Sequence, residues 1–147
     1  MPLPPFIDGD LPPGVYPVTL AEALDRFGQG SAQRRTVGAR LARIYRLAAS
    51  AGRLARFVVF GSFVTAKADP RDVDVVLLME DSFDLTAAPG EVAIVFDHAA
   101  ADAQLGASIF WACRSGAFGG EQAFVEYWQA RREGGRRGII EIVPGGT

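Results

Sequence analysis

Four residues near the middle of the chain have types and spacing that could do chemistry: Gly61, Ser62, Asp72 and Asp74. The two aspartates bracket Val73 at the start of an apolar run typical of a β-strand, where alternate side chains point to the same face. Two carboxylates on one face can hold a divalent cation, Mg²⁺ or Mn²⁺, against phosphate oxygens. The Gly-Ser pair ends another apolar run, where glycine permits close backbone approach and the hydroxyl can donate a hydrogen bond.

A purely structural role is easier to defend for one aspartate than for the other. Asp72 follows Pro70-Arg71, a place where an aspartate commonly bonds its own backbone in a turn. Asp74 lies inside the apolar strand, where a carboxylate is costly to bury without a metal ion or another cation. The pair therefore favours a metal site.

The segment Phe60-Gly61-Ser62, nine further residues and then Asp72-Val73-Asp74-Val75 resembles the signature of the DNA polymerase β-like nucleotidyltransferase superfamily. That signature is a hydrophobic residue, glycine, glycine or serine, a linker, and then aspartate-hydrophobic-acid-hydrophobic. The resemblance is strong over residues 57–79 and closest to small stand-alone bacterial members, often called minimal nucleotidyltransferases.

The resemblance implies both an activity and a role for each motif residue. Asp72 and Asp74 would bind magnesium and be catalytic, while Gly61 and Ser62 would contact the β- and γ-phosphates of a nucleoside triphosphate. The activity implied is transfer of a nucleoside monophosphate to a hydroxyl of a protein or RNA acceptor. Small members often act in toxin–antitoxin or defence systems, and acceptor recognition would need a partner or a second copy.

Several cations near the motif are candidate phosphate ligands. Lys67 and Arg71 lie in the linker and could contact phosphate, although a solvated loop is favoured for both. Five arginines lie on the predicted helix at 31–51, where a solvated face is favoured over phosphate binding: Arg34, Arg35, Arg40, Arg43 and Arg46.

The resemblance also implies a third carboxylate on a later strand, and the apolar run 107–113 contains no acid. Glu141, between two isoleucines, is the first candidate and Asp97 the second; the absence of any third ligand is also open. Without that acid, activation of the acceptor hydroxyl would weaken. The alternative function is therefore a catalytically degenerate nucleotide-binding or protein-interaction module of the same fold. A third interpretation is that the motif is accidental and the protein is an ordinary α/β scaffold.

Three other side chains invite functional roles for which structural ones are favoured. Trp111 and Trp128 could stack on a base, but their apolar neighbours favour core packing. His98 is the only histidine and lacks a visible catalytic partner, which favours a hydrogen-bonded structural role.

The elements that must position these residues follow from periodicity and capping. Thr19 and Glu22 form a capping-box pattern at the start of a helix that ends near Gly28. Further helices are predicted at 31–51, 90–104 and 120–131, and strands at 56–60, 73–79, 107–113 and 138–142. This order predicts an α/β fold, with one small mixed sheet flanked by helices, over residues 18–147. Residues 1–17 hold six prolines and predict an extended arm over the domain, with a partly disordered tail as the alternative.

Composition narrows the class of protein. The chain has 147 residues, 49% of them hydrophobic, which is the balance of one packed domain. A formal net charge of −2 argues against a general nucleic-acid coat. One cysteine provides neither a disulfide framework nor a zinc-ligand set. No apolar stretch approaches a membrane span and the start lacks a signal peptide, so a cytoplasmic location without a membrane partner is expected.

Overall fold

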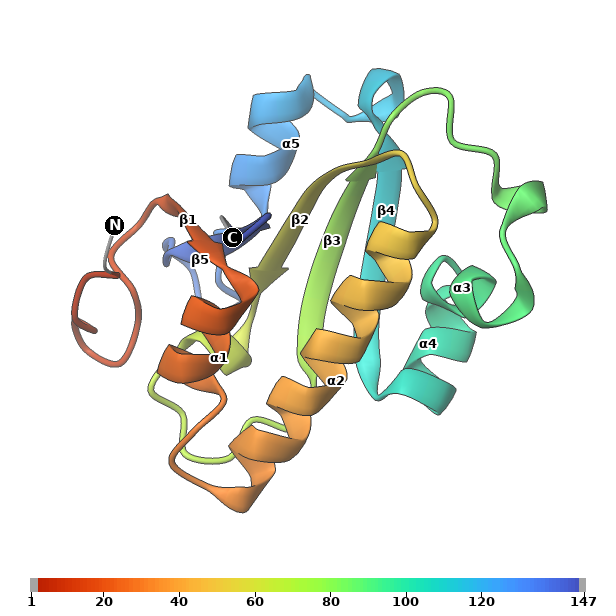
Figure 1. Ribbon diagram of the computed structural model, residues 1–147. Helices are drawn as coiled ribbons and strands as arrows, with labels where there is room; N and C mark the ends of the chain where they lie inside the picture. The colour runs from red at the N-terminus through yellow and green to blue at the C-terminus, as the bar shows by residue number, and fades with distance from the viewer. Residues whose placement is uncertain (1–2, 146–147) are drawn as a thin grey trace.

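A five-stranded mixed sheet organises the residues that the computed structural model describes, 3–145. Helices flank this sheet in one small domain, which confirms the predicted α/β fold (Figure 1). In chain order the elements are β1 (Val15–Thr19), α1 (Leu20–Phe27), α2 (Ala32–Ser50), β2 (Leu54–Phe60), β3 (Val73–Met79), α3 (Gly90–Val95), α4 (His98–Leu105), β4 (Ala107–Cys113), α5 (Glu121–Tyr127) and β5 (Ile139–Val143). The strands lie in the order β1-β5-β2-β3-β4, with β1 parallel to β5 and β3 parallel to β4.

Side-chain caps start the first two helices where the sequence predicts them. The Thr19 hydroxyl accepts from the Glu22 backbone N–H at 3.2 Å, and the Glu22 carboxylate accepts from the Thr19 N–H at 2.8 Å. The Ser31 hydroxyl accepts from the Arg34 N–H at 3.0 Å. These bonds satisfy backbone donors that have no partner inside the helix, so the starts of α1 and α2 are fixed locally.

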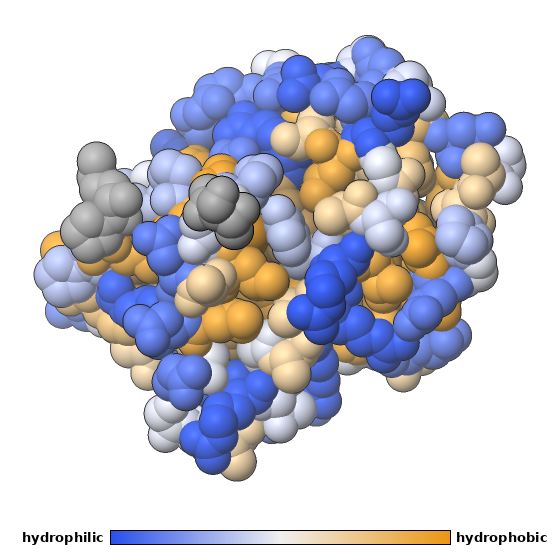
Figure 2. Space-filling view, viewed as in Figure 1, coloured by the Kyte–Doolittle hydropathy of each residue, from blue (hydrophilic) through white to orange (hydrophobic). Residues whose placement is uncertain are grey.

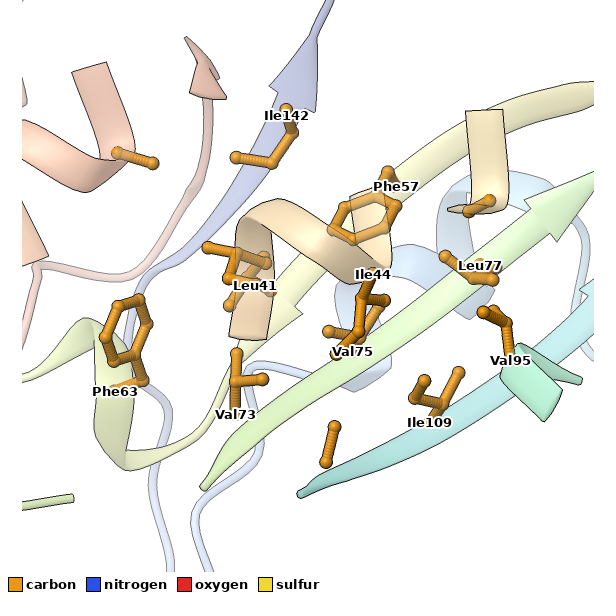
Figure 3. Close-up of a cluster of buried hydrophobic side chains, with 14 of the residues drawn as sticks. Leu41, Ile44, Phe57, Phe63, Val73, Val75, Leu77, Val95, Ile109 and Ile142 are labelled. Carbon is orange, nitrogen blue, oxygen red and sulfur yellow. The ribbon is translucent and has the colours of Figure 1, made fainter. Parts of the chain in front are cut away.

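One face of the sheet is covered by α1, α2, α3 and α4 and holds the larger core. Alternate residues of β3, Val73, Val75 and Leu77, point toward this side and are fully buried. Figure 3 shows them facing Leu41 and Ile44 of α2. The four helices therefore keep this face dry along its whole length.

The opposite face is covered by α5 over only part of its length. A smaller cluster packs there between the sheet and α5: Val58, Val76, Leu78, Ala117, Phe124, Val125 and Ile139. Asp74 alternates with Val76 along β3 and therefore points to the same face, but it lies beyond this cluster. The uncovered end of this face is where a cleft opens.

The first strand of the sheet is absent from the sequence prediction. β1 spans Val15–Thr19 and pairs in parallel with β5, so the expected boundary between arm and domain at residue 17 falls inside a strand. Pro17 has no backbone N–H, which an edge strand tolerates because only one side is paired. Leu11, further back in the arm, is also buried, with 1% of its surface exposed.

The single helix predicted at 90–104 is wrong, because the chain forms two helices there. α3 ends at Val95, and the Asp97 carboxylate accepts from the Ala100 N–H at 3.0 Å to start α4. Asp97 thus competes with helix continuation by capping a new one. The last helix is also shorter than predicted, since α5 covers only Glu121–Tyr127 of the range 120–131.

The surface on the α2 side mixes hydrophilic and hydrophobic residues (Figure 2). Hydrophilic residues gather along the outer side of α2, where three arginines are exposed as predicted for a solvated face: Arg35, Arg43 and Arg46. Within residues 3–145, no helix is long and apolar enough to cross a membrane.

Candidate functional site

The strand directions bring the motif residues to one edge of the sheet. β2 runs antiparallel to β3, and β4 runs parallel to β3, so the end of β2 meets the starts of the other two strands. Phe60 lies opposite Asp74, and Asp74 lies opposite Ser108. A cleft of about 840 Å³, within the usual range for a small-molecule site, opens at this edge. Gly61, Ser62, Asp72 and Asp74 all line it.

The Gly61 backbone lies directly against the Asp74 carboxylate. Gly61 has a φ of +79°, a conformation that other residues rarely adopt. A Cβ at this position would stand only 2.9 Å from Cγ of Asp74. Ser62 then begins a short 3₁₀ turn, Ser62–Val64, that borders the cleft. Glycine is therefore required here on two counts, and the motif's two halves are in contact.

The Asp74 carboxylate has a raised pKa, chiefly because it is partly shielded from water. Burial and, to a smaller extent, the neighbouring Asp72 carboxylate together raise its pKa to about 6. Arg132, Arg137 and a hydrogen bond from Ser108 act in the opposite direction without restoring the usual pKa. A cation placed between the two carboxylates would remove this cost.

Five cationic side chains surround the carboxylates on the cleft wall: Arg40, Lys67, Arg71, Arg132 and Arg137. Lys67 and Arg71 come from the linker between the two halves of the motif, and both side chains are exposed. Arg40 comes from α2. Arg132 and Arg137 come from the segment before β5, residues 131–137, which holds four arginines and is called the basic turn below. Cations next to an acidic pair suit a ligand that carries several negative charges together with a divalent metal ion.

Arg34 is not part of a solvated helix face, contrary to the sequence prediction. Its side chain is buried and donates to the backbone carbonyls of Phe27 (3.0 Å), Phe63 (2.9 Å), Thr65 (2.7 Å) and Lys67 (2.5 Å). Burial lowers the pKa of its guanidinium. Arg34 therefore holds the linker that follows Gly61 against the start of α2.

The N-terminal arm joins the two loops that form the cleft walls. The Asp10 carboxylate pairs with Arg131 and Arg137, each at 3.5 Å. Backbone carbonyls of the arm also accept from the N–H groups of Ala66 and Gly138, each at 2.8 Å. The arm thus ties the linker after β2 to the basic turn before β5.

Glu141 is not brought to the cleft, which corrects its expected role as a catalytic carboxylate. It lies on β5 opposite Val58, and the intervening strand β2 separates it from the aspartates. Arg56 on β2 binds it in two places, Nε to Oε2 at 3.0 Å and Nη2 to Oε1 at 2.6 Å. This bidentate pair with Arg56 occupies both oxygens of Glu141.

Asp97 is likewise absent from the cleft, because its carboxylate caps α4. On β4, Ser108 occupies the position across from Asp74 where an acid on that strand would stand. Among residues 3–145, no group of three or more histidine, cysteine, aspartate or glutamate side chains gathers closely enough to hold a metal ion. Two further carboxylates, Asp102 and Glu133, do line the cleft.

The single histidine and the two tryptophans all make structural contacts, and one tryptophan also reaches the cleft. His98 Nδ1 lies 3.1 Å from the carbonyl oxygen of Ile109, the structural role that the sequence favours. Trp111 donates to the carbonyl of Phe96 at 3.0 Å and packs at the edge of the larger core, also as favoured. Trp128 packs against the smaller core, as favoured, and its half-buried side chain also lines the cleft.

Several residues of the cleft were not identified as site residues from sequence: Arg40, Asp102, Ser108, Phe60, Phe110, Arg132 and Arg137. The basic turn at 131–137 carried a usable signal, since four arginines cluster there between two elements. Ser108 carried none, because its importance depends on which residue of β3 it pairs with.

A protein-family model matches most of this chain. The model of a family described as "Family of unknown function (DUF6932)" matches residues 4–143. No curated protein and no solved structure matches the chain.

Proposed function

The chain belongs to the DUF6932 family, and we propose that it is a metal-dependent nucleotidyltransferase-like protein. The ligand proposed for the cleft is a nucleoside triphosphate with Mg²⁺ or Mn²⁺. The reaction is transfer of its nucleoside monophosphate to a hydroxyl of a protein or RNA, and a toxin–antitoxin or defence context is part of the proposal.

The observation that carries the proposal is the half-buried Asp74 carboxylate beside Asp72 in the cleft, with its pKa raised to about 6. Carboxylates in clefts whose pKa is strongly perturbed by burial and a neighbouring charge mark candidate functional sites. The donor set fits magnesium, which commonly takes one or two carboxylates and completes its shell with water and substrate phosphates. Asp72 and Asp74 would hold the metal ion, which supplies neutralisation of charge on the phosphate oxygens when bound.

The chain's own groups then bind and orient the phosphates. Gly61 lies against Asp74 and Ser62 lines the same cleft, so the Ser62 hydroxyl would donate a hydrogen bond to a phosphate oxygen bound there. Lys67 and Arg71 face the same space from the linker and provide further positive charge. Asp102, which lines the cleft from α4, is a carboxylate that could accept the proton of an acceptor hydroxyl.

A catalytically degenerate nucleotide-binding module is the second candidate, and one observation favours it. The acid expected to complete the site, Glu141, is tied to Arg56, and Ser108 stands across from Asp74 on β4. Binding of nucleotide needs only the two aspartates and the cations, whereas transfer also needs a group that activates the acceptor.

A labelled-transfer assay separates the two candidates. The purified protein is incubated with labelled nucleoside triphosphates, magnesium and bacterial lysate, next to an Asp72→Ala/Asp74→Ala variant and a Glu141→Gln variant. Label transferred by the wild type and by Glu141→Gln, but lost in the double variant, supports the transferase. Magnesium-dependent nucleotide binding without transfer supports the degenerate module, and the absence of both refutes the proposal. Loss of transfer in Glu141→Gln with binding intact would restore Glu141 as a catalytic residue.

A further inference from the structure

Three aromatic rings form one wall of the cleft, and core packing does not account for all of them. Phe60 of β2 and Trp128, just after α5, have ring centroids 4.8 Å apart, and Trp128 and Phe110 of β4 have centroids 5.1 Å apart. All three line the cleft. Phe110 belongs to neither buried cluster and keeps 39% of its surface exposed. A large apolar ring exposed inside a polar cleft indicates a contact surface.

The register of the sheet fixes where this aromatic wall lies relative to the acids. Phe60 pairs directly with Asp74, whereas Phe110 pairs with Val76, two residues further along β3. Two residues of strand span about 7 Å, so Phe110 lies one step up the face from the carboxylate. A ligand with its phosphates at Asp72 and Asp74 therefore has room for one sugar before its base reaches Phe110, while Phe60 lies beside the carboxylate end.

We propose that Phe60, Trp128 and Phe110 form the platform on which the base of the bound nucleotide stacks. The inference rests on the proposed function, because it assumes that the phosphates occupy the carboxylate end of the cleft. Cations are confined to the loops and α2, and the aromatic wall offers the flat apolar surface that a base requires. Stacking on such rings tolerates every base, because each base presents a π-face. The platform thus binds any nucleoside triphosphate, with purines favoured by their larger area.

Tryptophan fluorescence can report directly on this platform. In a Trp111→Phe background, Trp128 is the only tryptophan, and its emission is titrated with ATP and, separately, with inorganic tripolyphosphate, both with magnesium. ATP quenches Trp128 while tripolyphosphate binds without quenching, because only ATP brings a base to the ring. Binding of tripolyphosphate is measured independently by calorimetry.

A leucine substitution separates stacking from simple apolar contact. Phe110→Leu weakens ATP binding at least about fivefold, given the usual size of base–aromatic stacking, and leaves tripolyphosphate binding unchanged. Phe110→Tyr retains the ring and restores ATP affinity. Phe118→Leu is the matched control, since Phe118 is also an exposed phenylalanine, at 53%, and it lies outside the cleft.

The outcomes distinguish failure of this inference from failure of the proposed function. Equal affinity for ATP and tripolyphosphate, unaffected by Phe110→Leu, overturns the platform and leaves the phosphate and metal site standing. No magnesium-dependent binding of either ligand overturns both. Quenching by a single-stranded RNA oligonucleotide with a 3′-hydroxyl, but not by ATP, assigns the rings to a base of the acceptor and overturns the assignment to the nucleotide.

Discussion

The two faces of the sheet differ in how completely they are covered, and the difference separates stability from chemistry. Four helices seal one face, where Val73, Val75 and Leu77 have no exposed surface. A single seven-residue helix covers part of the other face, where Asp74 meets the cleft. The dry face can therefore supply most of the folding energy, while the open end of the other face tolerates a destabilising carboxylate.

Neighbouring residues of β3 show how sharp this division is. Val75 lies in the larger core, and Asp74, one residue earlier, faces the cleft. A slip of one residue in the pairing of β3 would exchange them, placing a carboxylate in the dry core. The bonds from Arg34 to the linker and the contact between Gly61 and Asp74 both hold this register.

The largest expected loss of stability follows a substitution on the sheet face that α1, α2, α3 and α4 cover. Leu77→Ala removes a fully buried side chain from the larger core and lowers the free energy of unfolding by about 3–4 kcal/mol. Phe110→Ala, on the open face, lowers it by only about 1 kcal/mol, because Phe110 is 39% exposed and belongs to neither buried cluster. Urea denaturation of both variants measures this difference. Similar losses for the two variants would contradict the division between the faces.

A smaller loss of stability is expected from a substitution that frees the linker between β2 and β3 from α2. Arg34→Met leaves several buried carbonyls without a donor and lowers the free energy of unfolding by about 2–3 kcal/mol. Amide hydrogens of residues 62–67 exchange faster in this variant, since the linker loses its tether to α2. Arg35→Met, an exposed neighbour on the same helix, changes the free energy by less than about 0.5 kcal/mol. Unaltered exchange in the Arg34 variant would show that other contacts hold the linker.

The smallest effect has the opposite sign and depends on pH. The pKa of Asp74 rises from 3.8 to about 6 on folding, so between these pH values the folded state retains a proton that the unfolded state releases. The contribution of Asp74 to the stability of the folded state is therefore fully present below about pH 3.8, and it is lost as the pH rises through about 6. Asp74→Asn removes that loss and stabilises the metal-free protein by about 1–2 kcal/mol at pH 7, after allowance for solvent screening.

Thermal denaturation at pH 4 and pH 7 tests this. The advantage of the asparagine variant should be larger at pH 7, and magnesium with ATP should stabilise only the wild type. An asparagine variant that is less stable than the wild type at pH 7 would mean that Asp74 already has a protein partner.

Local signals account for what the sequence predicts correctly. The caps of α1 and α2 and the apolar runs of β2, β3 and β4 depend on neighbouring residues, and the structure agrees with them closely. The clustering of Gly61 with Asp74 follows because β2 and β3 are consecutive antiparallel strands. Alternation along β3 then places Asp72 and Asp74 at the same cleft.

The wrong or missing predictions concern partners that are distant in sequence. β1 contains a proline and pairs with residues 139–143 at the far end of the chain. The pattern around Glu141 indicates an acid on a strand but not which strand lies beside it, and that neighbour supplies Arg56. Arg34 has the spacing of a helix surface, and only the loop that packs over it makes it buried.

The bonds from the arm to both cleft walls have a consequence for how the protein is made. Asp10 leaves the ribosome long before its partners Arg131 and Arg137, which lie more than a hundred positions later in the sequence. The Gly14 N–H likewise donates to the side chain of Gln129, which is synthesised 115 positions later. Pairings of such separation form late, after the local elements. A nascent chain can thus assemble α2, β2 and β3 with their aspartates, but it acquires a finished cleft only when translation of the basic turn is complete.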